Sequence, residues 1–227
     1  MLETVEIPEG EFLMGCECGA ANERPQHPVR LERFAIARYA VTNLLFSKFL
    51  KATHCVIPSD WQPANDNRFN DPDQPVTSVS WFDATQFCSW LAETTGQAYR
   101  LPTEAEWERA ARGDLSDSLY ILGNEPQRVG SSGWESGPEP TSRGTGNTIG
   151  TYGMCENVHE WCSDWYDPAY YSCSPRDNPR GPSSGTRRSS RGGSWRHDIK
   201  ITRVAARSSI PPDYRYSDYG FRCALSL

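Results

Sequence analysis

The stretch Tyr99–Glu108, which reads YRLPTEAEWE, contains the clearest local signal for the fold. Thr103 is followed three residues later by Glu106, which is the spacing of a capping box, in which each side chain satisfies a backbone N–H of the other residue at a helix N-terminus. The helix is predicted to end at Gly113, because glycine is the residue most often found just after a helix. Trp107, in the first turn, is expected to face the core. The stretch therefore predicts a short scaffold helix.

Two further helices are predicted before this stretch. The first covers about residues 44–52, starts after a capping residue at Thr42 or Asn43, and carries its apolar side chains on one face. The second covers about residues 81–94 and is ended by Gly96. All three predicted helices lie in the first half of the chain.

The rest of the chain is predicted to consist of short strands and long loops. Gly, Pro, Ser and Asn are concentrated in stretches without a regular apolar period, which is typical of loops. The predicted loops are residues 58–75, 114–150 and 166–190. The predicted strands are two within residues 5–15, followed by 29–39, 158–165, 189–195, 199–207 and 219–224. Because neither a repeat nor a linker is visible, we expect one irregular α+β domain over residues 1–227.

The composition argues against two classes of partner. The chain carries a formal net charge of −6 and has a pI near 5.3, so no basic field favours nucleic acid or an anionic membrane. No apolar run approaches the roughly 18 residues that a membrane-spanning helix needs. The first residues lack the basic and apolar regions of a secretory signal, so a cytoplasmic location is expected. We therefore expect a protein, peptide or small-molecule partner, no nucleic acid and no membrane.

The eight cysteines do not indicate a disulfide scaffold, because such scaffolds are much richer in cysteine. Cys16 and Cys18 are expected to be too close in sequence to pair easily. Cys88 lies within a helical pattern and is expected to be a buried free thiol. We expect most of the cysteines to be reduced, and one or two disulfides remain open.

Six stretches in a fixed order match one protein family. They are Ile7–Gly15 (IPEGEFLMG), Tyr39–Asn43 (YAVTN), Tyr99–Glu108 (YRLPTEAEWE), Glu156–Trp161 (ENVHEW), Arg191–Trp195 (RGGSW) and Gly220–Arg222 (GFR). With these stretches the chain resembles the formylglycine-generating-enzyme family, also called sulfatase-modifying-factor domains, over nearly its whole length. The resemblance implies an irregular α+β fold of the C-type-lectin kind with little regular secondary structure.

The resemblance does not extend to the residues that perform the family's oxidation. Members that oxidise a substrate cysteine to formylglycine bind copper(I) through two cysteines after Gly-Gly-Ser, because soft thiolates select this ion. Counted from Gly-Gly-Ser, the corresponding positions here are His197 and Thr202, whereas counting back from Ala205-Ala206-Arg207 indicates a loop about three residues shorter than in such enzymes. No cysteine lies between Cys173 and Cys223. Copper is therefore not expected.

Three functions stay open on this basis. The first is a non-oxidising member, an accessory domain included, that binds a ligand or protein in a groove bordered by residues 192–207. The second is an oxidoreductase that modifies a protein cysteine with different metal ligands. The third is a variable binding protein of the diversity-generating-retroelement type, because such proteins also end in Gly-Phe-Arg.

Candidate residues follow from these hypotheses. His197 is a catalytic candidate because it falls where the family's reactive thiol lies, although a surface histidine without function explains it equally well. Arg203 and Arg207 are catalytic candidates because arginine binds anionic groups of a substrate. The binding residues predicted for the first function are polar and aromatic: Trp195, Arg196, His197, Asp198, Tyr214, Tyr216 and Tyr219.

A second metal pattern is present in the sequence. Cys155, His159 and Cys162 have a Cys-x3-His-x2-Cys spacing, which occurs in zinc or copper sites. On a strand, however, residues 155 and 159 share a face and residue 162 points to the opposite side. Buried thiols and a packed histidine therefore remain the alternative interpretation.

The resemblance also implies calcium. In related enzymes the positions of Glu156 and Val158 supply carbonyl oxygens and that of Glu160 a carboxylate, which are the oxygen ligands that calcium prefers. Gly153 replaces the usual Asn or Asp ligand. A second calcium loop would lie between residues 123 and 140, with Asn124, Glu125, Glu135 and Glu139 as the available ligands.

Overall fold

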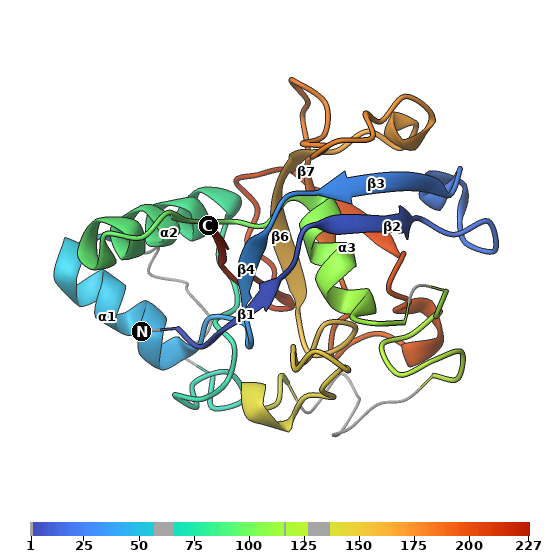
Figure 1. Cartoon of the computed structure of the whole chain (residues 1–227). Coiled ribbons are helices and arrows are strands. Elements are labelled where there is room, and N and C mark those ends of the chain that lie inside the picture. The colour runs from blue at the N-terminus through green and yellow to red at the C-terminus, as the bar shows by residue number, and fades with distance from the viewer. Residues whose placement is uncertain (1, 57–65, 116, 127–136) are drawn as a thin grey trace.

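The computed structural model describes residues 2–56, 66–115, 117–126 and 137–227. Within these residues it contains three α-helices, α1 (Asn43–Thr53), α2 (Trp81–Thr95) and α3 (Glu104–Arg112) (Figure 1). Each begins after a side chain that accepts a hydrogen bond from the first turn, namely Thr42, Ser80 and Thr103. The three helices were predicted from the sequence, and the capping box of Thr103 and Glu106 is confirmed.

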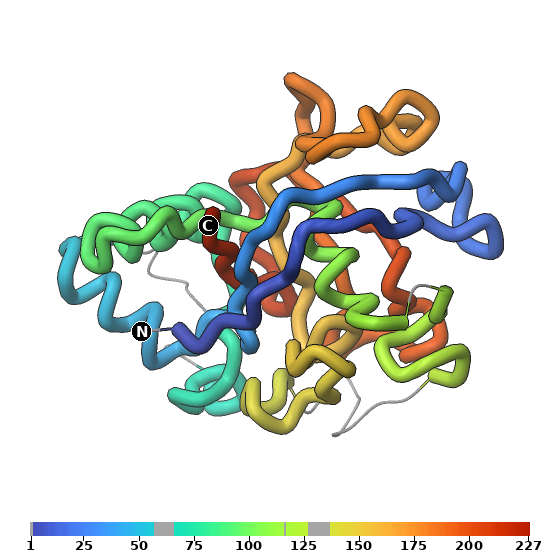
Figure 2. The backbone as a smooth tube through the Cα atoms, viewed as in Figure 1, coloured from blue at the N-terminus to red at the C-terminus, as the bar shows by residue number. Residues whose placement is uncertain are grey.

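Ten short strands form three sheets in the described residues. Their bounds are β1 (Thr4–Ile7), β2 (Gly10–Met14), β3 (His27–Leu31), β4 (Phe34–Ala37), β5 (Tyr99–Arg100), β6 (His159–Trp165), β7 (Arg188–Arg191), β8 (Arg207–Ile210), β9 (Tyr219–Gly220) and β10 (Ala224–Ser226). The strand orders are β1-β4-β10-β5, β2-β3 and β8-β7-β6-β9. The first and last strands of the chain both pair with β4, so the two ends lie close together (Figure 2).

Four strand predictions are corrected by the structure. The strand expected over 199–207 is wrong: residues Ile199–Ile201 form a 3₁₀ turn, because the Asp198 side chain accepts a hydrogen bond from the Lys200 N–H (3.0 Å). The strand expected over 189–195 ends at Arg191, because Gly192 has a φ of +79° and leaves the extended region.

The strands expected over 29–39 and 219–224 are each divided in two. β3 and β4 replace the first, because the Glu32 N–H is taken by the Asn178 side chain (2.9 Å). β9 and β10 replace the second, and they pair in different sheets.

Strand β6 separates two hydrophobic cores. One core contains the inner faces of α1 and α2 with Trp161, and the other contains α3, β2 and β3 with Cys162. Neighbouring side chains on a strand point to opposite faces, so β6 contributes to both cores. In Figure 1, α1 and α2 lie together at one end of the molecule and α3 lies against β2 and β3. None of the helices in the described residues could cross a membrane.

Buried ion pairs connect α3 to the C-terminal third of the chain. Glu108 pairs with Arg112 (2.6 Å) and with Arg191, and all three side chains are almost fully buried. Glu104, on the same helix, forms a two-pronged pair with Arg207 (2.6 and 3.0 Å). A buried charge without its partner is strongly destabilising, so the stability of the fold requires both members of each pair.

A second buried pair connects β6 to the last strands. Glu160 accepts hydrogen bonds from the Arg222 guanidinium (2.6 and 2.8 Å) and from the Trp107 indole N–H (2.7 Å). Arg222 also donates to the carbonyl oxygens of Ala37 and Tyr152 (3.0 and 2.7 Å). Arg222 is therefore a structural residue that joins four segments of the chain.

The cysteine predictions have two outcomes. Cys16 and Cys18 form a disulfide, so the expectation that they are too close to pair is wrong. The turn after Gly15 sets their Cα atoms 5.3 Å apart, which lies in the range that a disulfide requires. Cys88 is a buried free thiol, as predicted, and its Sγ lies 3.7 Å from that of Cys223.

Replacing Arg222 by methionine is expected to destabilise the protein by about 3–5 kcal/mol, because Glu160 would remain buried without its counter-charge. Urea denaturation of wild type and variant measures this difference. The matched control is Arg33→Met, which removes an exposed pair with Glu6 and is expected to cost at most about 1 kcal/mol. Equal effects of the two substitutions would contradict the structural role of Arg222.

Asp164 predicts a pH dependence of stability. Its carboxylate lies buried below the N-terminus of α3, where it accepts from the Glu104 N–H (3.0 Å) and the Ser163 hydroxyl (3.0 Å). Burial first, and the charge of Glu104 second, raise the pKa of Asp164 to about 7. In the unfolded chain the pKa of an aspartate is about 3.9. Between the two pKa values the folded state therefore binds a proton that the unfolded state has released. The stability contributed by protonated Asp164 is present at low pH and is lost as the pH rises through about 7.

The substitution Asp164→Asn is expected to remove this dependence. Between pH 5 and pH 7.5 the free energy of unfolding of the wild type should fall relative to the variant by about 2–3 kcal/mol. Urea denaturation at intervals of half a pH unit measures the difference. Parallel curves would show that Asp164 is ionised in the folded protein throughout this range.

Candidate functional site

The loop after β7 is held in place by two glycines. A side chain at Gly192 would lie 2.5 Å from the Met154 carbonyl oxygen, and one at Gly193 would overlap Thr202 and approach the Cys155 carbonyl oxygen to 2.7 Å. The glycines therefore allow the loop to pack directly on the backbone of residues 154–155. It is this backbone that the glycine pair accommodates.

Ser194 directs the loop toward the start of β9. Its hydroxyl donates to Asp218 Oδ2 (3.1 Å) and accepts from the Arg196 N–H (3.3 Å). Its carbonyl oxygen accepts from the His197 N–H (3.0 Å), which closes a tight turn. The turn carries His197 over the first residue of β6.

His159 is that residue, and it lies beside Asp218. Its backbone N–H donates to the Asp218 carbonyl oxygen (2.8 Å) where β6 and β9 run parallel. The His159 ring lies 4.9 Å from the His197 ring and 4.8 Å from the Tyr219 ring, measured between centroids. His159 is 6% exposed, and its Nδ1 makes no hydrogen bond to the described part of the chain.

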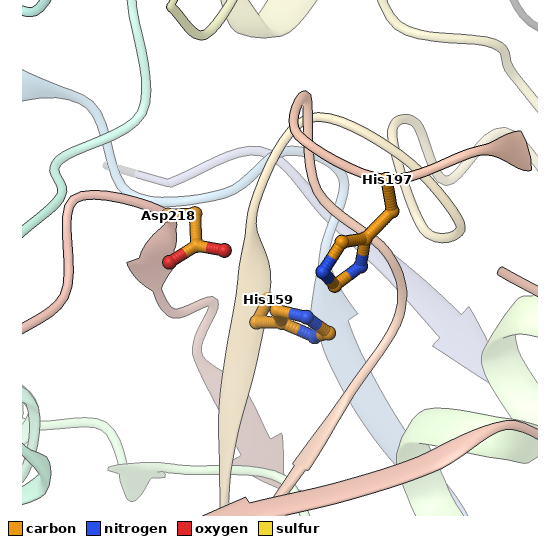
Figure 3. Close-up of side chains that lie close together, drawn as sticks. All are labelled: His159, His197 and Asp218. Atoms are coloured by element: carbon orange, nitrogen blue, oxygen red, sulfur yellow. The ribbon is translucent and has the colours of Figure 1, made fainter. Parts of the chain in front are cut away.

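His159, His197 and Asp218 together form a compact group of possible metal ligands. One ligand atom from each residue lies within 4.8 Å of those of the other two. Figure 3 shows the His197 ring and the Asp218 carboxylate approaching His159 from two different loops. It is the only such group of three in residues 2–56, 66–115, 117–126 and 137–227. Imidazole and carboxylate can bind a metal ion or transfer a proton.

The environment keeps the His159 ring neutral. Burial lowers the pKa of His159 to about 4, although the charge of Asp218 acts in the opposite direction. At neutral pH the ring therefore carries a lone pair on one nitrogen.

The predicted binding residues are divided between the interior and the surface. Trp195 and Tyr219 are buried: Trp195 packs against Phe69 with centroids 5.8 Å apart, and the Tyr219 hydroxyl lies between Ser190 and Ser208. The others are partly or fully exposed: Arg196, His197, Asp198, Tyr214 and Tyr216. A direct contact with a partner stays a prediction for these five residues.

In the structure the two arginines predicted as catalytic candidates form ion pairs within the fold. Arg203 forms a two-pronged ion pair with Glu23 (2.7 Å for both contacts), and Arg207 forms the buried pair with Glu104. Both guanidinium groups are therefore engaged within the fold. This arrangement gives them a structural role and disfavours their assignment as catalytic residues.

The Cys-x3-His-x2-Cys pattern does not form a metal group. His159 belongs to a group of three possible ligands that includes neither Cys155 nor Cys162. Both thiols are buried in the core on the α3 side of β6, and burial raises their pKa well above the usual value. The sequence analysis missed Asp218, although its place just before the Gly-Phe-Arg stretch is a usable signal.

Two of the three residues expected to bind calcium, Glu156 and Glu160, already have protein partners. The Glu160 carboxylate is held by Arg222 and Trp107, and the Glu156 carbonyl oxygen accepts from the Val158 N–H (2.9 Å). Calcium binding through Glu160 would have to break a buried ion pair, so the geometry disfavours this ligand. Calcium stays a prediction. Of the second predicted loop, Glu135 lies outside the described residues.

Comparison with known proteins identifies the family. Residues 1–227 match the model of the sulfatase-modifying factor enzyme 1-like domain. The chain is 36% identical to the formylglycine-generating enzyme of Streptomyces coelicolor, over 97% of this chain and 88% of that protein. The chain therefore belongs to the formylglycine-generating-enzyme, or sulfatase-modifying-factor, family.

Two solved structures show the same fold. PvdO from Pseudomonas aeruginosa has a TM-score of 0.87 and 26% identity, covering 100% of this chain and 95% of that one. The Treponema denticola variable protein 1 has a TM-score of 0.83 and 24% identity, covering 99% and 95%. The predicted irregular α+β, C-type-lectin-like fold is thus confirmed.

Proposed function

We propose that this protein is a family member that does not oxidise cysteine with copper and instead binds a ligand at the loop over residues 211–217. The statement that the protein does not oxidise cysteine with copper depends on which residues stand at the two positions where copper-binding relatives have cysteines. They hold His197 and Thr202, and Thr202 is buried with its hydroxyl donating to the Ile199 carbonyl oxygen (2.9 Å). An imidazole and a buried hydroxyl are not the soft thiolate pair that copper(I) selects.

Other cysteines are poor substitutes for that pair. Cys155 and Cys162 are buried in an apolar core, and their raised pKa keeps them protonated at neutral pH. A protonated thiol is neither a good metal ligand nor a nucleophile. The residues at these positions therefore do not provide the thiolates for the formylglycine-generating activity that the names of the relatives describe.

The loop over residues 211–217 supports the second half of the proposal. It is fixed at both ends, because the Trp81 N–H donates to the Pro212 carbonyl oxygen (2.9 Å) and the Ser78 N–H to that of Tyr216 (3.0 Å). Arg215 pairs with Asp83 (2.9 Å) at the start of α2. A loop that is held in one conformation loses little entropy when it binds a partner.

This fixed loop presents aromatic side chains to solvent. Tyr214 and Tyr216 are 46% and 44% exposed, and their rings lie 5.9 Å apart. Tyrosine and arginine are enriched in the binding surfaces of proteins, because they offer apolar area together with hydrogen-bonding groups. The positive charges of Arg196 and Arg215 are paired with Asp218 and Asp83. A peptide or protein with aromatic groups would suit this surface.

An oxidoreductase that uses different metal ligands is the second candidate. The specific observation in its favour is the cluster of His159, His197 and Asp218, since His197 occupies one of the two copper positions. This candidate needs a bound metal ion, and the ligand-binding function does not.

The first test of the proposal is loading with copper(I) followed by incubation in air with a cysteine-containing sulfatase peptide. We expect no stoichiometric copper after desalting and an unchanged peptide mass. Elemental analysis and mass spectrometry measure the two quantities. One equivalent of retained copper together with aldehyde formation would overturn the proposal and favour the second candidate.

The second test is a selection of displayed peptides on the immobilised protein. Enriched peptides are expected to lose at least about tenfold in affinity when Tyr214 and Tyr216 are both replaced by alanine, which is the effect of losing hot-spot aromatic residues. The matched control is Leu44→Ala, which removes an exposed apolar side chain of similar exposure (48%) on α1. Peptides that bind wild type and both variants equally would place the binding surface elsewhere.

A further inference from the structure

We propose that His159, His197 and Asp218 form a binding site for a divalent first-row transition-metal ion, such as Zn²⁺ or Fe²⁺. The proposal goes beyond ligand binding at the loop over residues 211–217 (the tyrosine loop) and does not depend on it. The three residues come from three separate segments: the start of β6, the loop after β7 and the residue before β9. Their convergence is a property of the tertiary structure.

The distances suit a site that tightens around an ion. The ligand atoms lie within 4.8 Å of one another. Around an ion with bonds of about 2.0–2.2 Å, ligand atoms are about 3–3.5 Å apart, so the group has to contract by about 1–2 Å. His159 and Asp218 are fixed relative to each other by the backbone hydrogen bond between them (2.8 Å). His197 is half-buried on a loop and can supply the movement.

Hydrogen bonds orient the Asp218 carboxylate toward the two histidines. The Ser194 hydroxyl donates to Oδ2, and Oδ1 accepts a longer hydrogen bond from Arg196 Nη1. Metal-binding carboxylates are usually held by such hydrogen bonds, which orient them. Arg196 Nη1 lies 3.5 Å from Oδ1, and its side chain is 28% exposed, so it can turn toward solvent when an ion binds.

The buried ring nitrogen of His159 also points to a ligand. Nδ1 is inaccessible and makes no hydrogen bond to a described residue. Buried polar atoms in native proteins nearly always have a partner, whether protein, water or ion. The backbone of Arg191 and Gly192 also interacts with this ring, and a bound ion would give Nδ1 the partner that it lacks.

The ligand set selects the class of ion. Two imidazoles and one carboxylate suit zinc, iron, nickel and cobalt, whereas calcium and magnesium prefer oxygen ligands alone. Copper(I) prefers thiolates, which this group lacks. Three protein ligands leave at least one coordination position open to water or to a coordinating group of a bound ligand.

The test is a metal titration of the full chain after treatment with EDTA and desalting. Calorimetry with Zn²⁺ is expected to show one saturable site, and Co²⁺ is expected to give visible absorption bands that one equivalent of Zn²⁺ removes. His197→Ala is expected to weaken Zn²⁺ binding at least tenfold. Ser194→Ala, which removes the hydrogen bond to Asp218 and the one that the hydroxyl accepts from the Arg196 N–H, is expected to weaken it by about ten- to a hundredfold.

The matched control is His54→Asn, which removes an exposed histidine and keeps a residue that tolerates the positive φ of this position. Circular dichroism establishes that each variant is folded. Saturable binding that His54→Asn abolishes and His197→Ala leaves unchanged would overturn the proposal, and so would the absence of saturable Zn²⁺ binding by the wild type. Neither result affects the peptide selection, which is performed in EDTA and reports only on the tyrosine loop.

Discussion

Buried pairs of arginine and glutamate are the interactions on which the rest of this structure depends. Arg191 meets Glu108, and Arg222 meets Glu160, with every side chain nearly inaccessible to water. Each pair connects two stretches of the family pattern that are distant in sequence, and Trp107 connects the two pairs by its hydrogen bond to Glu160. Long segments without regular secondary structure can be held by a few such contacts, because each guanidinium also satisfies carbonyl oxygens of passing loops.

The same pairs position the candidate site. His159 is adjacent to Glu160, and because neighbours on a strand face opposite sides, fixing Glu160 in the interior turns His159 toward the loops. Arg191 fixes the point at which the glycine turn begins and thereby the path to His197. Arg222 fixes the end of the segment that carries Asp218. The arrangement of His159, His197 and Asp218 is therefore fixed by buried ion pairs that are not themselves reactive.

The residues that hold the fold together are therefore distinct from the residues of the proposed sites. The fold is shared with PvdO at a TM-score of 0.87, whereas no cysteine lies between Cys173 and Cys223 of this chain. Function in such folds resides in the residues attached to the frame, and these can change while the frame stays the same. The proposed ligand surface and the proposed metal site both consist of residues outside the buried ion pairs.

The sequence by itself determined the helix that starts after Thr103, the family, and the absence of cysteine between Cys173 and Cys223, because capping and ordered motifs are local or can be counted. Only the tertiary structure decided that Arg207 is a buried partner of Glu104 and that Asp218 joins His159 and His197. The disulfide of Cys16 and Cys18 was also hidden, because it depends on the turn after Gly15. The physical reason is that parallel pairing of β6 with β9 and the burial of charges depend on contacts between distant segments, which leave no period in the sequence.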